Sequence, residues 1–243
     1  MLCLSDTDYL YLGLHEESFI FVSMKMDLSH AFEGTTYTTI EQGGSSMDLN
    51  NLFYATNMFA RSSIETIDVS NWGLSHLRSA SGMFSLCSNL KSLTGSGNWH
   101  LDTLENAEGM FEGDEKLGTL DVSNWGLPST KNTSSMFSGC TSLQLIGSGN
   151  WSLKNLEKAD FMFSTCGTTT LHAESWDLSK LQSADGMFMD SQLQEICING
   201  TTAMKLEELG AITELDDVVE SDIYKLKGEV YDDSFEVLST KKC

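Results

Sequence analysis

The dipeptide Met-Phe recurs along this chain at almost constant spacing. The period is about 26 residues. The six copies are Met58-Phe59, Met83-Phe84, Met110-Phe111, Met136-Phe137, Met162-Phe163 and Met187-Phe188. A fixed period of this length is typical of repeat architectures, in which each unit buries its apolar side only against its neighbours. The sequence therefore predicts a solenoid.

Further residues keep the same period. A tryptophan precedes each of the last five Met-Phe pairs at one constant separation, at Trp72, Trp99, Trp125, Trp151 and Trp176. Apolar residues then follow at steps of three, as at Leu74, Leu77 and Ala80, whereas the half between Met and the next Trp varies in length and ends in Gly, Ser, Asp and Asn. Each unit is therefore predicted to contain one short strand, one turn, and a return segment of short helical or 3₁₀ character.

The array extends beyond its clearest copies. Ala31-Phe32 lies one period before Met58-Phe59 and fits as a degenerate Met-Phe pair. We predict about seven rungs between residues 28 and 198, with parallel strands about 4.8 Å apart. The predicted fold class is an α/β repeat, with a parallel sheet joined by short helical or 3₁₀ return segments.

The two ends do not follow the repeat. Residues 1–27 contain two alternating apolar runs, DYLYLGLH and SFIFVSMKM, which predict a β-hairpin. Residues 199–243 contain a helical candidate, TAMKLEELGAI, an acidic linker and two strand-like runs, DIYKLKGEVY and SFEVLS. Because an open terminal rung exposes core and unpaired backbone, both ends are predicted to be caps. The alternative for residues 199–243 is a docking segment for a partner.

The repeat unit carries a resemblance to a known family. The pattern DVSNWGL, followed by L..A..MF..C..L..L, resembles the leucine-rich repeat of BspA-like bacterial surface proteins, which also occurs in mycoplasma lipoproteins of unassigned function. The similarity covers about 170 of the 243 residues. It implies a leucine-rich-repeat-like, right-handed solenoid and roles in adhesion and protein binding at cell surfaces.

The charge and the first residues bear on partners and location. A net charge of −21 repels phosphate backbones and anionic lipid, so we expect no nucleic-acid partner. The start, MLCLSDTDYL, lacks a basic and apolar leader, and no run is long enough to cross a membrane. We therefore expect no signal peptide, no anchor and no membrane insertion, and either an extracellular, cell-surface location or a place in a virion.

Cysteines raise the questions of disulfides and metal. Cys87, Cys140 and Cys166 occupy the same position relative to the Met of their repeat, so they share one column. Cys140 and Cys166 occupy adjacent rungs and could approach to about 5 Å, within bridging range. A buried column of free thiols is the preferred interpretation, because Asp114 and Ser191 hold the same position elsewhere. No C-x-x-C or H-x-x-x-H pair occurs, so no metal site and no cofactor are predicted.

No catalytic group is predicted either. The five histidines do not recur at a repeat position with a carboxylate or nucleophile, and they are His15, His30, His76, His100 and His172. Asp68 and Asp121 begin the DVSNW turns and are expected to cap them. We therefore expect a protein that is not an enzyme.

Two recurring positions beside the turns are informative. The asparagine before each Trp, as at Asn98 and Asn124, is expected to bond the backbone of the next rung and to form a ladder. The tryptophans are expected in the core, and the alternative is an exposed aromatic row that serves as a platform for sugar or protein partners.

Two functional classes follow. The first is a protein- or glycan-binding module of the adhesion type, whose ligand contacts lie at turn positions that differ between rungs, namely Gly73, His100, Gly126, Ser152 and Asp177. The second is a structural virion component of a phage, such as a decoration, fibre or tail-associated subunit. In that case the terminal segments, residues 199–243 above all, would contact neighbouring virion subunits.

Overall fold

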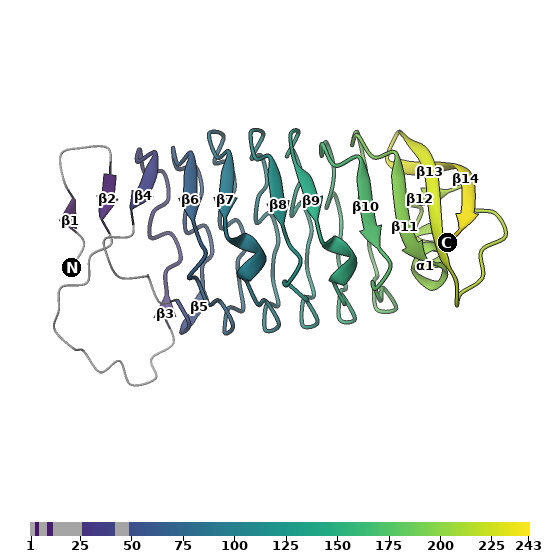
Figure 1. Cartoon of the computed structure of the whole chain (residues 1–243), viewed down its shortest axis with the longest axis horizontal. Helices are drawn as coiled ribbons and strands as arrows, with labels where there is room; N and C mark the ends of the chain where they lie inside the picture. Colours follow the sequence, from purple (N-terminus) through teal and green to yellow (C-terminus); the bar gives the residue numbers. More distant parts are fainter. Residues whose placement is uncertain (1–2, 5–8, 12–25, 42–48) are drawn as a thin grey trace.

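A computed structural model shows the chain as an elongated stack of turns (Figure 1). The structure describes residues 3–4, 9–11, 26–41 and 49–243. Short parallel strands lie side by side along the stack, which has about eight turns and little helix. The protein is therefore a parallel β-solenoid, as the repeat predicts.

One row of strands, here called the strand ladder, runs along the main face of the stack in three hydrogen-bonded groups. Its members are β2 (Tyr9–Tyr11), β4 (Thr39–Glu41), β6 (Thr66–Asp68), β7 (Ser92–Thr94), β8 (Thr119–Asp121), β9 (Gln144–Ile146), β10 (Thr170–Ala173) and β11 (Glu195–Asn199). The register places equivalent repeat positions side by side, for example Leu120 beside Leu145. Because β2 pairs in parallel with β4, the stack begins before residue 28, and about eight turns replace the predicted seven.

A second ladder runs along the return segments. It begins with β3 (Met26–Asp27) beside β5 (Leu52–Tyr54) and continues as single parallel bridges from Tyr54 to Ser79 and onward to Ser183. The predicted helical or 3₁₀ return segment is therefore wrong. Residues such as Leu77, whose N–H donates to the Leu74 carbonyl at 3.0 Å, form single turns between extended bridge residues. A continuous helix could not donate sideways to the neighbouring rung.

The described 3₁₀ helices lie before the tryptophans instead. They are η1 (Ser96–Asn98) and η2 (Ser148–Asn150), and each follows a glycine. Gly95 and Gly147 have φ values of 85° and 87°, in the left-handed region that residues with a Cβ seldom adopt. The GSGN clusters are therefore tight corners of the solenoid.

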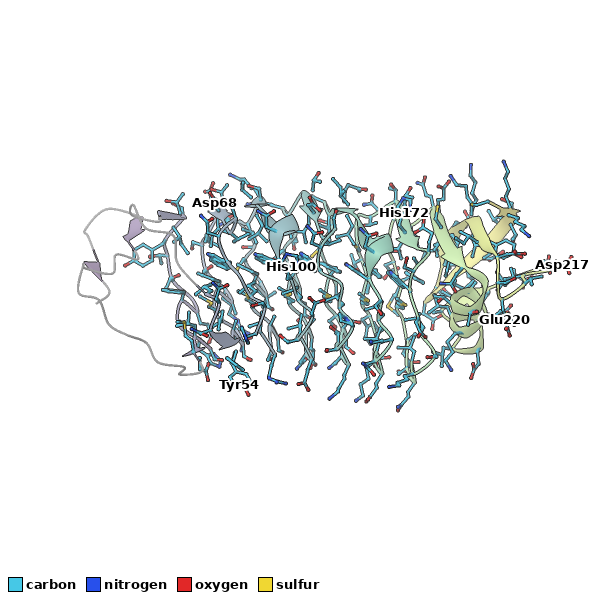
Figure 2. The ribbon with its side chains drawn as sticks, turned by 60° about the horizontal axis from the view of Figure 1, so that its bottom comes forward. Tyr54, Asp68, His100, His172, Asp217 and Glu220 are labelled. Atoms are coloured by element: carbon cyan, nitrogen blue, oxygen red, sulfur yellow. The ribbon has the colours of Figure 1, made fainter. Side chains whose placement is uncertain are left out.

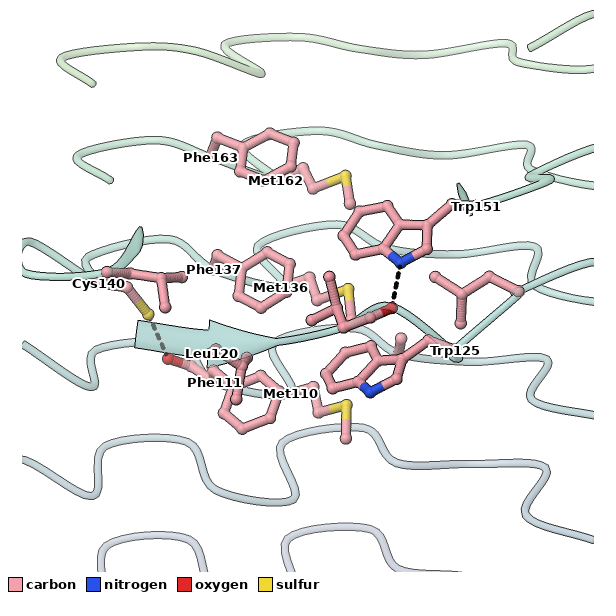
Figure 3. Packing of buried hydrophobic residues seen from close by; sticks show 14 of the residues in the cluster. Met110, Phe111, Leu120, Trp125, Met136, Phe137, Cys140, Trp151, Met162 and Phe163 are labelled. Carbon is pink, nitrogen blue, oxygen red and sulfur yellow. Dashed lines mark hydrogen bonds between the residues drawn. The ribbon is translucent and has the colours of Figure 1, made fainter. Parts of the chain in front are cut away.

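Methionine and phenylalanine columns form the centre of the core. All six Met-Phe pairs are buried, and Phe32 also stacks on Phe59 with ring centroids 5.0 Å apart. Figure 3 shows Phe111, Phe137 and Phe163 in one row; the Phe137 centroid lies 5.7 Å from each of the other two. The Phe137 N–H donates to the Met162 carbonyl of the next rung at 2.9 Å. The predicted burial of both columns is confirmed.

The tryptophans form a second buried row beside this one. All five are buried, and neighbouring indoles stack, with the Trp99 and Trp125 centroids 5.5 Å apart. The indole N–H of Trp125 donates to the Ser96 carbonyl at 2.9 Å, and that of Trp176 donates to the Ser148 carbonyl at 2.8 Å. The core assignment is confirmed, and an exposed aromatic platform is wrong.

The shared cysteine column contains free, buried thiols. Cys140 and Cys166 are not bridged. The Cys140 Sγ donates instead to the Phe111 carbonyl at 3.0 Å, as Figure 3 shows. Asp114 occupies the same column and is fully buried; its Oδ1 accepts the Cys87 N–H at 2.8 Å. Desolvation raises the pKa of Asp114 well above its ordinary value, and burial together with the Asp114 charge raises the pKa of Cys87 to about 12.

The turn chemistry follows the prediction with one change. The Asp68 Oδ1 accepts the Ser70 N–H at 2.9 Å, which confirms the capping role predicted for this residue. The Asn124 and Asn150 Nδ2 groups donate to the carbonyls of Gly97 and Ser123 at 2.7 and 3.1 Å. These partners lie in the preceding rung, not the next one. The ladder satisfies corner carbonyls that the strands leave unpaired.

The N-terminal end is described only in part. β1 (Cys3–Leu4) pairs antiparallel with β2. The second run of the predicted hairpin in residues 1–27, SFIFVSMKM, lies outside the described residues except for its last one, as does His15.

At the C-terminal end the predicted helix and two strands are present. They are α1 (Gly200–Glu208), β13 (Ile223–Tyr231) and β14 (Ser234–Lys242), with a short β12 (Ile212–Thr213) between α1 and β13. β13 pairs antiparallel with β11 and with β14, so the parallel ladder ends at β11.

Candidate functional site

The outward face of the strand ladder is a continuous surface of side chains. In β6 and β8 the first and third residues are exposed and the middle one is buried, as expected where one face of a strand covers the core. Figure 2 shows Asp68 and His172 projecting along one side of the stack, whereas Tyr54 projects from the opposite side. Neighbouring strands therefore present a two-dimensional array of side chains to solvent.

The array differs from rung to rung, although the core position beside it does not. From β6 to β11, the middle residues of successive strands are all aliphatic and are buried except for the half-buried Leu145, whereas the residue that follows changes. In strand order the latter are Asp68, Thr94, Asp121, Ile146, His172 and Cys197, of which Cys197 is buried and the others are exposed. In the sequence, Ile146 continues the three-residue apolar spacing of Cys140 and Leu143, which predicts a core position, and the structure contradicts this prediction. Its side chain is 53% exposed, because Leu145 pairs with Leu120 and holds the inward position.

The predicted turn positions lie at the corners after the tryptophans. His100 and Asp177 are exposed, whereas Gly73, Gly126 and Ser152 are half-buried. The structure joins three of the five into one row. The Ser152 N–H donates to the Gly126 carbonyl at 2.7 Å, and the Asp177 N–H donates to the Ser152 carbonyl at 2.8 Å. Much of the hydrogen-bonding capacity of this row is therefore used between rungs, and two of the five predicted residues lack a side chain.

One cluster on the outward face was missed by the sequence analysis. His172, Glu174 and Cys197 each offer one ligand atom, and these atoms lie within 4.8 Å of one another. The His172 Nδ1 and Glu174 Oε1 atoms are 2.8 Å apart. This pair occurs in one rung only, so it does not recur at a repeat position. His172 and Glu174 stand at alternate positions, so they share one face of an extended chain, and this spacing was the available signal.

The charge state of Cys197 bears on what this cluster can do. Burial raises the pKa of its thiol, and the nearby carboxylates of Glu174 and Glu195 raise it further. A cysteine nucleophile requires a lowered pKa, because the thiolate is the attacking species. The arrangement is therefore unlike an activated cysteine beside a histidine.

Two other described histidines have surface partners. The His30 Nδ1 lies 2.5 Å from Glu33 Oε2, and the His76 Nδ1 lies 2.7 Å from the Asn50 carbonyl. Both side chains are exposed. The His76 Nδ1 also lies 3.3 Å from the hydroxyl of the neighbouring Ser75.

An acidic cleft lies at the C-terminal end of the stack. Its volume is about 360 Å³, and Glu214, Asp216 and Asp217 line it together with Thr240 and Lys242 of β14. Figure 2 shows Asp217 projecting beyond the end of the stack. The cleft is open and polar, so it suits a charged segment of a partner better than an apolar small molecule.

No helix in the described part of the chain is both long and apolar enough to cross a membrane.

Comparison with other proteins assigns a family. The chain matches no curated protein and no solved structure. It matches the family described as Mycoplasma protein of unknown function, DUF285, over residues 22–117 and 89–199. These two overlapping matches cover well over half of the chain and most of the strand ladder described above. The chain therefore belongs to the DUF285 family of Mycoplasma proteins of unknown function.

Proposed function

We propose that this protein is a non-enzymatic binding module that holds a protein or glycan ligand on the outward face of its strand ladder. The observation that carries the proposal is the contrast between the aliphatic inward position and the changing outward position in consecutive strands. A constant core fixes the spacing of the strands, and the side chains between them can then vary without cost to packing. Such a rigid surface suits ligand recognition over several rungs.

The charge of this face selects the chemistry of the ligand. Asp68 and Asp121 project outward, Glu174 and Glu195 lie at the end of the same face, and the whole chain carries a net charge of −21. Acidic surfaces attract basic partners and repel phosphate backbones. We therefore infer a ligand with basic or hydroxyl-rich groups, and no nucleic acid.

The family resemblance supports a finer description. The repeat resembles that of BspA-like surface proteins, and we infer a leucine-rich-repeat-like, right-handed solenoid with both terminal segments acting as caps. The antiparallel pairing of β13 with β11 supports the cap at the C-terminal end, because it occupies the edge of the last parallel strand. An extracellular, cell-surface location with an adhesion role accompanies this proposal.

A structural role in a virion is the second candidate. Of the nine exposed large apolar side chains in the described residues, five lie in residues 199–243, and they are Met204, Val219, Ile223, Tyr231 and Leu238. An excess of exposed large apolar side chains in one segment favours a contact surface there. In this role the C-terminal segment would contact neighbouring subunits, and the strand face would be secondary.

Ligand selection followed by surface variants tests the two roles. The full chain is screened against a glycan array and a peptide display library, and the strongest ligand is measured with Asp121→Lys on the strand face. Lys158→Glu, a position on the other ladder, is the matched control. We expect at least a tenfold loss of affinity in Asp121→Lys and little change in Lys158→Glu.

Three other outcomes are informative. Loss of binding in Asp177→Lys alone would move the site to the predicted turn row. Unchanged binding in Asp121→Lys and Asp177→Lys, together with loss of binding in Leu238→Glu, would support docking through the C-terminal segment. Chemical conversion of the selected ligand would contradict the non-enzymatic role.

A further inference from the structure

We propose that His172, Glu174 and Cys197 form a zinc-binding site on the outward face of the strand ladder. Their ligand atoms all lie within 4.8 Å of one another. The three residues come from the last two parallel strands, β10 and β11, and the turn after β10. The site is thus located where the repeat stack meets the C-terminal segment.

Strand register brings the three side chains together. His172 pairs directly with Cys197 across the parallel ladder of β10 and β11. Glu174 follows His172 at the next alternate position, and Ala173 between them is buried in the core. Side chains at alternate positions project to the same face, and neighbouring strands are about 4.8 Å apart. Backbone geometry alone therefore places all three on one small area.

The backbone that carries the ligands is held on both sides. The Ser148 Oγ donates to the His172 carbonyl at 2.9 Å and accepts the His172 N–H at 3.3 Å. The Asn199 Nδ2 donates to the Glu174 carbonyl at 3.1 Å and to the Trp176 carbonyl at 2.8 Å. Ligands with supported backbones lose less freedom when an ion binds, which favours binding.

The preceding rung leaves space for the carboxylate. A Cβ atom at Gly149 would lie 2.6 Å from the Glu174 Oε2 atom. That distance is well below van der Waals contact, so any other residue at position 149 would displace the carboxylate. Gly149 therefore leaves room for the observed position of the Glu174 carboxylate.

The set of donor atoms selects the metal. One imidazole nitrogen, one carboxylate oxygen and one thiolate sulfur are typical zinc ligands, whereas magnesium and calcium prefer oxygen alone. Zinc bonds of about 2.0 to 2.3 Å in a tetrahedron place donor atoms roughly 3.3 to 3.8 Å apart. The observed separations, 2.8 Å for the His172–Glu174 pair and at most 4.8 Å overall, require only small side-chain rotations. A water molecule or a donor from a ligand would complete the fourth position.

The surrounding charges are compatible with a cation. Glu195 adds a carboxylate close to Cys197, and the nearby ammonium of Lys225 is paired with Glu195 at 2.6 Å. The exposed Cys243 at the end of the chain lies within electrostatic range of Cys197. Because a cysteine binds zinc as the thiolate, zinc binding at Cys197 would release a proton.

The cluster departs from the repeat. The equivalent outward positions of the earlier strands are Asp68, Thr94, Asp121 and Ile146, which contain neither histidine nor cysteine. The ligands are therefore not a by-product of the repeated unit. A zinc ion at this place would join β10 to β11 and strengthen the contact between the stack and the segment that follows it.

Metal titration of the full, reduced chain tests the proposal. Zinc binding is measured by calorimetry, and cobalt is used as a spectroscopic probe because a cobalt–thiolate bond gives a charge-transfer absorption. We expect one zinc per chain, the cobalt–thiolate absorption, and a higher melting temperature with zinc. Cys197→Ser should abolish the absorption, and His172→Ala should weaken zinc binding at least tenfold.

Matched variants separate this site from general metal binding. Cys243→Ser removes the nearby exposed thiol and should leave the absorption and the zinc affinity unchanged. Glu174→Gln keeps the shape of the side chain and should weaken zinc binding, with circular dichroism showing that the fold is retained. Equal zinc affinity in the wild type, Cys197→Ser and His172→Ala would overturn the proposal, as would an absorption that disappears only in Cys243→Ser. Ligand binding by Asp121→Lys is measured separately, so failure of the zinc site does not decide the proposed function.

Discussion

The repeat stack and the C-terminal segment stabilise themselves in different ways. In the stack, Phe rings lie between two others and each rung exchanges hydrogen bonds with its neighbours, as Phe137 does with Met162. Residues 199–243 contain long antiparallel strands, a helix and most of the exposed large apolar side chains. The stack thus obtains its stability from near-identical neighbours. The end segment must pair with the last rung and must not leave an unpaired strand edge to which another strand could add.

This difference predicts that replacing a core phenylalanine lowers the free energy of unfolding more in the stack than in the end segment. Phe137→Ala should lower the free energy of unfolding by about 3–5 kcal/mol, because it leaves a cavity and removes ring contacts with Phe111, Trp151 and Phe163. Phe235 is equally buried, but no aromatic ring stacks on it among the described residues. Phe235→Ala should therefore cost less in the same urea titration.

Phe161 provides the control within the stack. It lies close to Phe163 in the same rung but is 41% exposed. Phe161→Ala should change the free energy of unfolding by no more than about 0.5 kcal/mol. Equal costs for Phe137→Ala and Phe161→Ala would contradict the buried column.

Glycines test how closely the rungs approach. A Cβ at Gly167 would lie 2.2 Å from the Thr141 carbonyl oxygen of the preceding rung, whereas one at Gly118 would meet only the Lys91 carbonyl oxygen at 3.7 Å. Gly167→Ala should therefore cost about 1–3 kcal/mol of stability. Gly118→Ala should be neutral or stabilising by about 0.4–1 kcal/mol, measured by thermal unfolding.

Gly228 extends this comparison to the end segment. A Cβ there would lie 2.0 Å from the Glu236 carbonyl oxygen, at the bulge between β13 and β14. Hydrogen exchange of Gly228→Ala should show loss of protection in β13 and β14 with the stack still protected, whereas Gly167→Ala should weaken protection on both sides of its rung. Uniform loss in both variants would show that stack and segment unfold as one unit.

At neutral pH, the buried carboxyl of Asp114 should make the stack less stable than a neutral side chain at the same position would. Its Oδ1 accepts one N–H, but its buried Oδ2 has no partner in the described residues. Asp114→Asn should raise the free energy of unfolding by about 1–3 kcal/mol at pH 7. Asp217→Asn, an exposed carboxylate of the C-terminal segment, should have little effect.

The pH dependence gives this prediction a definite sign. Burial raises the pKa of Asp114, so the native state holds its proton at pH values where the unfolded chain has lost it. The wild type should therefore lose stability, relative to Asp114→Asn, as the pH rises above the unfolded value of about 3.9. The advantage of Asp114→Asn should decrease on acidification toward that value. An advantage that grows on acidification would contradict the buried, protonated carboxyl.

The smallest effect is expected at the surface ion pairs of the return segments. Glu105 lies between Arg78 and Lys131, with N–O distances of 2.5 and 3.0 Å, and all three side chains are exposed. Hydrogen bonds from Lys131 and Arg78 lower the pKa of Glu105, so the pairs stabilise the protein above the unfolded pKa of about 4.3, and this contribution is lost as the pH falls through the lowered pKa. Because water screens the pairs, Glu105→Gln should cost less than about 1 kcal/mol.

Salt separates this contribution from packing. The cost of Glu105→Gln should decrease in high salt, whereas that of Phe137→Ala should not. Glu208, which pairs with Lys205 at 3.0 Å in the C-terminal segment, is the matched control in Glu208→Gln. If Glu105→Gln lowered the free energy of unfolding more than Gly167→Ala does, the ion pairs would be a main contribution to the contact between rungs.

Prediction from sequence succeeded at structural positions that occur once in every copy of the repeat, because each copy gives an independent example of the same position. Six Met-Phe pairs and five tryptophans report the same inward-facing positions, so the burial of both rows and the parallel strands follow from periodicity alone. The free thiols of Cys140 and Cys166 were predicted for the same reason, because other residue types occupy their column. A residue that is considered in one repeat only is harder to place. The apolar spacing predicts that Ile146 points into the core, but its side chain is exposed.

The sequence by itself determined the solenoid, its period and its core columns, because every copy of the unit must bury the same side chains against its neighbours. Tertiary structure alone decided the conformation of the return segments, where pairing between rungs requires extended residues that local spacing does not reveal. It also decided which outward side chains meet. His172 and Cys197 lie one full repeat apart along the chain, and only the register of β10 and β11 places them side by side. That register depends on contacts between rungs, which no short window of sequence contains.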